Sequence, residues 1–282
     1  MEILEPSGQV THGPDVSFLI PAFNQATALE RSLPVLLKEL QSATFSFEIL
    51  VSDNASTDET WSICRHWSRS DGSVKAFHQG QNLGFLGNLR FLSGKSTGSY
   101  LFFLGCGDLL SISRLNLLVP ILKETGPHSL VSGVATHETL EDYLDPPINA
   151  TLKIVKLSRL SKNVPYQEAF SGNIFRNVNR ELDIYLQRTF RSGDVWPHVE
   201  IQISAFLEGK TVLRTPENLV SMMQDQISWY NDVGEQRRVF LAHLRVLLPH
   251  IMKSTGFLVK VVSLLTLGIW NLAIRRQPSA GA

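Results

Sequence analysis

Two carboxylates stand where apolar segments of strand length end. Asp53 closes the run that begins at Phe47, and Asp108 follows the run that begins at Tyr100. In an open α/β sheet, ligands bind outside the carboxyl ends of the strands. A carboxylate in that place can accept hydrogen bonds from a base or a sugar, and carboxylate oxygens also suit a hard cation such as Mg²⁺. The two residues therefore predict a ligand site at one edge of a sheet.

The elements that position these carboxylates follow an alternating pattern. Strands are expected at 16–23, 47–53, 74–79, 100–105 and 129–134, with helices starting near 27, 58 and 85 and further helices at 197–207 and 235–252. Ser56 with Glu59, and Thr27 with Glu30, have the spacing of capping boxes, which open helices. The alternation predicts βαβ units and a mostly parallel sheet.

Size and charge narrow the class of protein. The chain has 282 residues, enough for one sizeable core or a main domain with a small appendage. The chain has 26 Lys and Arg residues and 26 Asp and Glu residues, so it lacks the excess of positive charge that is typical of nucleic-acid-binding proteins. Cys64 and Cys106 lie in expected core elements behind a polar N-terminus, so we expect reduced thiols in a cytosolic protein.

Two segments, 18–24 and 52–58, carry a recognisable pattern that continues through 82–84, Asn88 and 98–100 to 104–110. Together they resemble the inverting glycosyltransferases of family 2, and within that family the branch that includes abequosyltransferase and other surface-polysaccharide enzymes. The resemblance is close over the first 110 residues and looser to about residue 215. It implies the α/β fold called GT-A, a Rossmann-like, mostly parallel sheet flanked by helices. The expected organisation is a loose tail at 1–14, a catalytic domain at 15–215 with a donor half (15–110) and an acceptor half (111–215), and a helical C-terminal region at 216–282.

The resemblance also implies which residues bind the sugar donor. Those expected on the donor side are Pro21, Ala22, Asn24, Asp53, Asn82, Asn88, Arg90 and Asp108, with Asp53 accepting from the base and Asp108 binding a divalent metal, Mn or Mg. Two positions depart from the family pattern: Gly107 replaces an expected acid, and Gly87 replaces a basic residue for which Arg90 is a substitute. The structural alternatives are a turn residue for Asp53, a helix cap for Asp108 and a solvated helix residue for Arg90.

Residues from the second half of the chain are expected to bind and activate the acceptor. The resemblance of segment 170–176 places Ser171, Gly172 and Asn173 on the acceptor side, and a buried strand with a bulge at Gly172 is the alternative. Trp196 is expected to stack on a sugar there, with packing in the core as its alternative. The general base should be a carboxylate or a His, and the candidates are Asp194, His198 and Glu200, in that order. A helix-entry cap is the alternative for Asp194, and a buried contact is the alternative for His198.

The segment 257–274 is apolar on nearly every side. As a helix it would be roughly 27 Å long, at the short edge of a membrane span. Docking on the catalytic domain or on a second subunit, lying in a membrane interface, and spanning the membrane remain three alternatives. The second would place the protein at the inner face of the membrane.

The predicted activity is transfer of a sugar, with inversion, from a nucleoside-diphosphate sugar to a hydroxyl of a glycan or lipid-linked acceptor in surface-polysaccharide synthesis. The alternative is a catalytically degenerate protein that binds nucleotide or glycan within a polysaccharide-assembly complex, for which Gly107 is the supporting feature. The expected partners are therefore the donor, the acceptor and a divalent metal, without nucleic acid, and homo-oligomerisation is left open.

Overall fold

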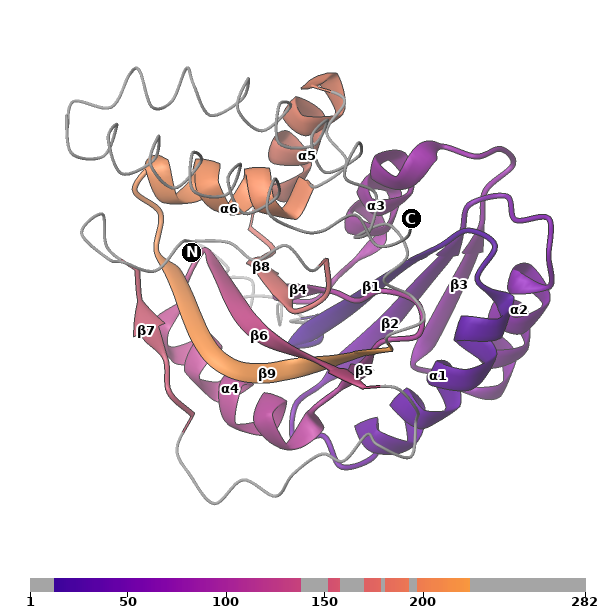
Figure 1. Ribbon diagram of the computed structural model, residues 1–282, viewed down its shortest axis with the longest axis horizontal. Helices are drawn as coiled ribbons and strands as arrows, with labels where there is room; N and C mark the ends of the chain where they lie inside the picture. Colours follow the sequence, from indigo (N-terminus) through magenta and orange to yellow (C-terminus); the bar gives the residue numbers. More distant parts are fainter. Residues whose placement is uncertain (1–12, 138–151, 158–169, 179–180, 193–196, 224–282) are drawn as a thin grey trace, which may run out of the picture.

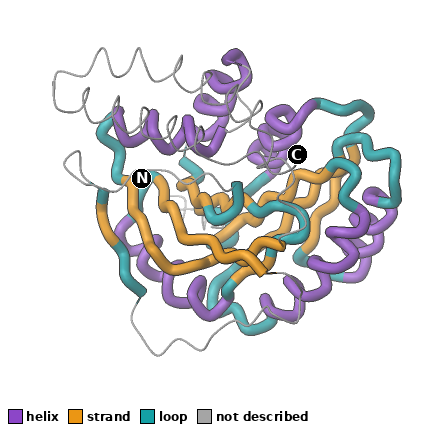
Figure 2. Tube along the Cα trace, in the orientation of Figure 1, coloured by secondary structure: helices purple, strands orange, loops and turns teal. Residues whose placement is uncertain are grey.

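In the computed structural model, a nine-stranded sheet carries helices on both faces. The structure describes residues 13–137, 152–157, 170–178, 181–192 and 197–223. Helices α1, α2 and α4 lie against one face of the sheet, and α3, α5 and α6 lie against the other (Figure 1). Figure 2 shows the same layers, with the strands between the two groups of helices.

The first half of the chain builds the parallel part of the sheet. Its elements are β1 (Val16–Ala22), α1 (Ala26–Leu40), β2 (Phe47–Asp53), α2 (Thr60–Ser70), β3 (Val74–His78), α3 (Gly84–Lys95) and β4 (Tyr100–Phe103). The strands lie in the order β3-β2-β1-β4, and each neighbouring pair is parallel. The predicted strands and βαβ units are confirmed here, with boundaries shifted by a few residues.

The second half extends the sheet beyond β4. Its elements are β5 (Leu109–Leu110), α4 (Ile112–Thr125), β6 (Ser129–His137), β7 (Val155–Lys156), β8 (Asn173–Arg176), α5 (Glu181–Ser192), α6 (Pro197–Leu207) and β9 (Val212–Met223). The antiparallel pairs all involve β5, β7 or β8. The predicted strand at 129–134 and helix at 197–207 are confirmed. β9 continues past residue 215, so residues 216–223 are strand and not the start of a helical region.

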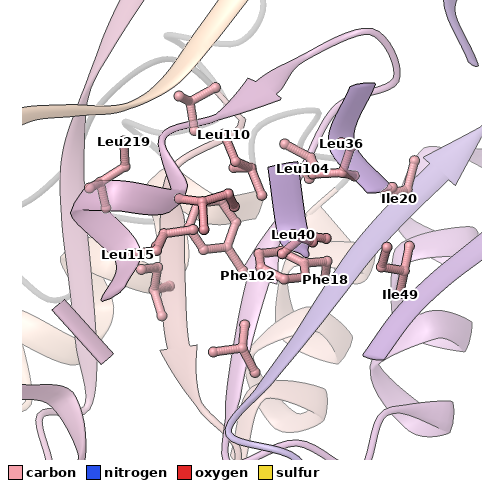
Figure 3. Close-up of a cluster of buried hydrophobic side chains, with 14 of the residues drawn as sticks. Phe18, Ile20, Leu36, Leu40, Ile49, Phe102, Leu104, Leu110, Leu115 and Leu219 are labelled. Carbon is pink, nitrogen blue, oxygen red and sulfur yellow. The ribbon is translucent and has the colours of Figure 1, made fainter. Parts of the chain in front are cut away.

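The parallel strands are apolar almost throughout because helices cover both faces of the sheet. In β1, Phe18 and Ile20 face α1 and α4, whereas Leu19 between them faces α3. Figure 3 shows Phe18 beside Phe102 of β4, with ring centroids 5.4 Å apart, among leucines from the helices. This packing holds the parallel strands in place, so that their carboxyl ends lie at the same edge of the sheet.

The starts of α1 and α2 differ from the predicted capping boxes. Thr27 lies inside α1, and Ser56 accepts a hydrogen bond from Asn24 N at 2.8 Å in place of capping α2. Asp58 takes the capping role at both helices: its carboxylate accepts from Thr60 N at 3.0 Å and from Ala26 N at 3.1 Å. The capping-box predictions are therefore wrong, because the loop after β2 supplies the caps for two helices.

Within the described residues, no helix has both the length and the apolar character needed to cross a membrane. The segment 257–274, the predicted helix at 235–252 and the tail at 1–12 lie outside the described residues.

Candidate functional site

The loops after β1 and β4 meet at the point where the strand order reverses. β2 lies on one side of β1 and β4 lies on the other, so the connections that follow β1 and β4 leave in different directions. Such a switch point opens a crevice outside the carboxyl ends of the strands. The loop after β4 contacts the carboxyl end of β1 through the Cys106 thiol, which lies 3.5 Å from the carbonyl oxygen of Pro21. Pro21, Ala22 and Asp108 are therefore brought to one edge of the sheet.

Asp108 lies almost entirely inside this edge, with 6% of its surface exposed. Ser171 Oγ donates a hydrogen bond to the Asp108 carboxylate and accepts one from Gly105 N at 2.7 Å. Burial raises the pKa of the Asp108 carboxyl to about 6, although the hydrogen bond from Ser171 favours the charged form. A cation beside Asp108 would offset this cost of burial. The carboxylate also joins the loop after β4 to the segment that carries Ser171, which is predicted to lie on the acceptor side.

Asp108 is the protein's candidate metal ligand at this edge. The described residues contain no group of three or more His, Cys, Asp or Glu side chains that could hold a metal ion. Mg²⁺ is commonly bound by one or two carboxylates together with substrate phosphates, so a single buried carboxylate fits a cation that arrives with a diphosphate. The donor set favours Mg²⁺ or Mn²⁺ over a thiolate-preferring ion.

The missing acid at position 107 has a backbone explanation. Gly107 has φ 89°, in the region that favours glycine over residues with a side chain. An acid at this position would carry a conformational cost in this loop. Both nearby cysteines are free and buried, and burial raises the pKa of Cys64 to about 12 and that of Cys106 above its usual value. Neither thiol is therefore poised as a thiolate ligand.

Gly105 sets the space around the Asp108 carboxylate. A Cβ atom at this position would lie 2.7 Å from Asp108 Oδ2 and 3.3 Å from Ser171 Oγ. We expect Gly105→Ala to move the carboxylate and to lower the predicted sugar-transfer activity by about 10²-fold, since small displacements of a site group carry penalties of that order. Gly94→Ala is the matched control, because a Cβ there meets nothing within 4 Å and lies in a helix. Equal turnover by the two variants would contradict the prediction.

Asp53 ends β2 with its side chain fully buried. Its carboxylate accepts hydrogen bonds from Ser56 N at 3.2 Å and from His78 Nδ1 at 2.7 Å. The ring of Trp61 lies beside His78, with centroids 5.0 Å apart and planes 30° apart. The contact to Ser56 is what the turn alternative expected, and the donor role of Asp53 stays a prediction. Sequence reasoning missed His78 and Trp61, because only the β2–β3 register brings His78 to Asp53.

Asn24 joins the loop after β1 to the loop after β2. Its backbone has φ 52°, and its Oδ1 accepts from Thr57 N at 2.9 Å. Gln25 N donates to Thr60 Oγ1 at 2.8 Å in the same region. The side-chain oxygen of Asn24 thus holds the two loops together, and its contact with a donor stays a prediction.

Asn82 lies in the loop before α3, and Asn88 lies within that helix. Asn82 Oδ1 accepts from Asn54 Nδ2 at 2.9 Å, which fixes the loop after β3 against the loop after β2. Asn88 is buried and donates to the carbonyl oxygen of Ser52 at 2.9 Å. Arg90 donates from Nε to Asp183 of α5 at 2.6 Å and is about half exposed. Arg90 is therefore engaged on α5 in this structure, and its donor role stays untested.

The residues predicted for the acceptor side gather around the ring of Phe170. This ring stacks on Phe103 at a centroid distance of 5.2 Å and meets the edges of Phe85 and His198 at 5.1 and 5.8 Å. Ser171, Gly172 and Asn173 follow it, and all three are buried, as is His198 in the first turn of α6. The arrangement brings His198 close to the segment that holds Asp108. Glu200 follows in α6, whereas Asp194 and Trp196 lie outside the described residues.

A protein-family model described as glycosyl transferase family 2 matches residues 17–185, more than half of the chain. This chain belongs to that family and is a glycosyltransferase, which confirms the resemblance seen in the sequence.

Curated relatives are glycosyltransferases as well. The GalNAc(5)-diNAcBac-PP-undecaprenol beta-1,3-glucosyltransferase of Campylobacter jejuni is 24% identical over 242 residues, covering 78% of this chain and 77% of that protein. Glycosyltransferase AglD of Haloferax volcanii is 25% identical over 186 residues, covering 63% of this chain but only 30% of its own length.

Solved structures share the fold. S. aureus TarS 1-349 in complex with UDP matches with a TM-score of 0.61 and 15% identity, covering 86% of this chain and 67% of that one. The mannosyltransferase PcManGT from Pyrobaculum calidifontis, in complex with GDP-Man and Mn²⁺, matches with a TM-score of 0.51 and 15% identity, covering 94% of this chain and 83% of that one. The expected GT-A fold is confirmed.

Proposed function

We propose that the protein transfers a sugar, with inversion, from a nucleoside-diphosphate sugar to a hydroxyl of a lipid-linked glycan during synthesis of a surface polysaccharide. The observation that carries this proposal is the position of Asp108, a buried carboxylate at the strand-order switch point, on the loop that contacts Pro21. The Campylobacter relative, whose name specifies an undecaprenol-linked acceptor, supports the lipid-linked class of acceptor.

The donor would lie across the carboxyl ends of β1, β2 and β4. Pro21, Ala22 and Asp53 would line the side of the base, and Asp108 would hold a divalent cation at the diphosphate. When bound, the cation supplies Lewis-acid stabilisation of the leaving diphosphate. The structural match to a mannosyltransferase complexed with GDP-Man and Mn²⁺ supports this assignment.

The acceptor would approach from the side of Phe170, Ser171 and Asn173. A base near α6 would take the proton from the attacking hydroxyl, and Asp194, His198 and Glu200 remain its candidates. His198 is favoured by its 5.8 Å ring contact with Phe170, since Phe170 precedes the residue that hydrogen-bonds to Asp108. The protein would act at the inner face of the membrane, where a lipid-linked acceptor is presented. The segment 257–274 is the candidate for contact with the membrane.

Binding of one nucleotide with metal tests the donor site. We expect one of UDP, GDP, CDP and dTDP to raise the unfolding temperature in the presence of Mn²⁺, because a ligand that binds only the folded state stabilises it by about 2.7 kcal/mol at a hundred times its dissociation constant. The same nucleotide without metal should give a smaller shift. Transfer is then measured as diphosphate release that depends on an undecaprenol-linked acceptor. No shift with any of the four nucleotides would contradict the proposal.

A further inference from the structure

His78 stands at the end of β3 beside the buried carboxylate of Asp53. In the parallel register, Ala22, Asp53 and His78 are successive neighbours across β1, β2 and β3, at the edge where the loops of the site lie (Figure 1). The His78 side chain is 44% exposed, whereas that of Asp53 is fully buried. A ligand that approaches this end of the edge therefore reaches the imidazole more readily than the carboxylate.

Asp53 fixes which ring nitrogen of His78 carries a proton. The 2.7 Å contact joins His78 Nδ1 to Asp53 Oδ2, and the carboxylate is the acceptor, so Nδ1 carries the hydrogen. The other carboxylate oxygen of Asp53 accepts from Ser56 N. In the neutral imidazole, Nε2 then has a free lone pair and accepts hydrogen bonds.

Trp61 holds the imidazole in one orientation. Its ring comes from the first residues of α2 and lies 5.0 Å from the His78 ring, with 30° between the planes. Asp53 and Trp61 thus constrain His78 from two elements.

We propose that His78 reads the base of the nucleotide donor through Nε2, with Asp53 fixing its tautomer and Trp61 its orientation. The inference rests on the proposed function, because it assigns a contact within the same donor site. We infer that Nε2 faces the ring nitrogen on the pairing edge of the base, where uracil, thymine and guanine carry an N–H group. Cytosine and adenine have a bare ring nitrogen at that place and could offer only an exocyclic amino group. The inference therefore assigns a uridine, thymidine or guanosine diphosphate sugar as the donor.

Two substitutions separate a contact with the base from simple support of Asp53. His78→Ala removes both ring nitrogens, whereas His78→Asn keeps an N–H group near the position of Nδ1 and removes only the outer nitrogen. His66→Ala is the matched control, since His66 is also an exposed histidine beside a tryptophan, Trp67, with centroids 5.3 Å apart. Thermal unfolding checks that each variant folds.

The experiment is calorimetric titration of each protein with UDP, dTDP, GDP and CDP in the presence of Mn²⁺. We expect the wild type to prefer one nucleotide with a ring N–H over CDP, and both His78 variants to lose about tenfold in affinity for it, as one lost hydrogen bond predicts. Affinity for CDP should change little, and His66→Ala should match the wild type.

Three outcomes would overturn the inference while the proposed function stands. They are a wild-type preference for CDP, an unchanged preference in His78→Ala, and an unchanged preference in His78→Asn, which would reduce His78 to a support for Asp53. Failure of the wild type to bind any of the nucleotides would instead overturn the proposed function, and this inference with it.

Discussion

Asp108→Asn is expected to lower the rate of sugar transfer by roughly 10³-fold while leaving the fold intact. A bound cation contributes several kcal/mol to stabilising the developing charge, and each 1.36 kcal/mol is a factor of ten in rate. Asparagine has nearly the same shape as aspartate, so the packing around position 108 should survive. The Ser171 hydroxyl can still donate to the side-chain oxygen of Asn. What is lost is the negative charge that holds the cation.

The measurement is acceptor-dependent diphosphate release with Mn²⁺, together with nucleotide binding with and without metal. Asp71→Asn serves as the control, because Asp71 accepts a hydrogen bond from Ser73 N at 2.8 Å before the start of β3, away from the site edge. The amide oxygen of Asn can accept the same bond, so this variant should keep wild-type turnover. If Asp108→Asn binds nucleotide in a metal-dependent manner as tightly as the wild type, Asp108 is not the metal ligand.

The parallel half of the fold could be predicted from the sequence because its signals are local. A strand covered on both faces must be a nearly continuous apolar run, and the segments 47–53 and 100–105 satisfy this without reference to their neighbours. The carboxylates after two such runs then had to lie at one edge. Asp53 and Asp108 could be placed in this way before any contact was known.

The parts that could not be predicted depend on contacts between distant residues. Asp58, in the loop after β2, caps α1 through Ala26 N, which lies 32 residues earlier in the chain, whereas capping-box spacing considers one helix at a time. The contact of His78 with Asp53 follows from the register of two strands. The strands β5 and β7 have two residues each, which is too short to show an alternation of apolar and polar residues in the sequence. They are defined by their pairing with β9.

The opposite edge of the sheet contains a buried carboxylate whose removal should have the largest effect on stability. Glu48 is 4% exposed and accepts hydrogen bonds from Ser17 Oγ at 2.6 Å, Thr97 N at 2.7 Å and Lys75 Nζ at 2.6 Å. It therefore ties β1, β2 and β3 to the segment before β4. Ser17 Oγ in turn accepts from Gly98 N at 2.8 Å. A neutral apolar residue at position 48 would leave the buried Ser17 hydroxyl and the part-buried Thr97 amide without this acceptor.

We expect Glu48→Ala to lower the free energy of unfolding by about 1–3 kcal/mol, the range found when a buried hydrogen-bond donor loses its acceptor. Urea denaturation at pH 7 measures the change. Lys75→Ala is the matched control: Lys75 is about half exposed and can be replaced by water, so its loss should cost less than about 1 kcal/mol. Equal losses in the two variants would show that the buried donors find other partners.

The same carboxylate predicts a pH dependence of stability. Burial disfavours the charged form of Glu48, but hydrogen bonds from Lys75, Ser17 and Thr97 outweigh it and hold its pKa below the usual value of 4.5. The unfolded chain therefore binds a proton at higher pH than the folded chain. The stabilisation by Glu48 should be complete above pH 4.5 and should be lost as the pH falls through the folded pKa.

Urea denaturation of the wild type should show this loss below pH 4.5, and Glu48→Ala should show a shallower decline, because the group whose protonation is linked to unfolding is absent. Parallel declines in the two proteins would assign the acid sensitivity to other carboxylates.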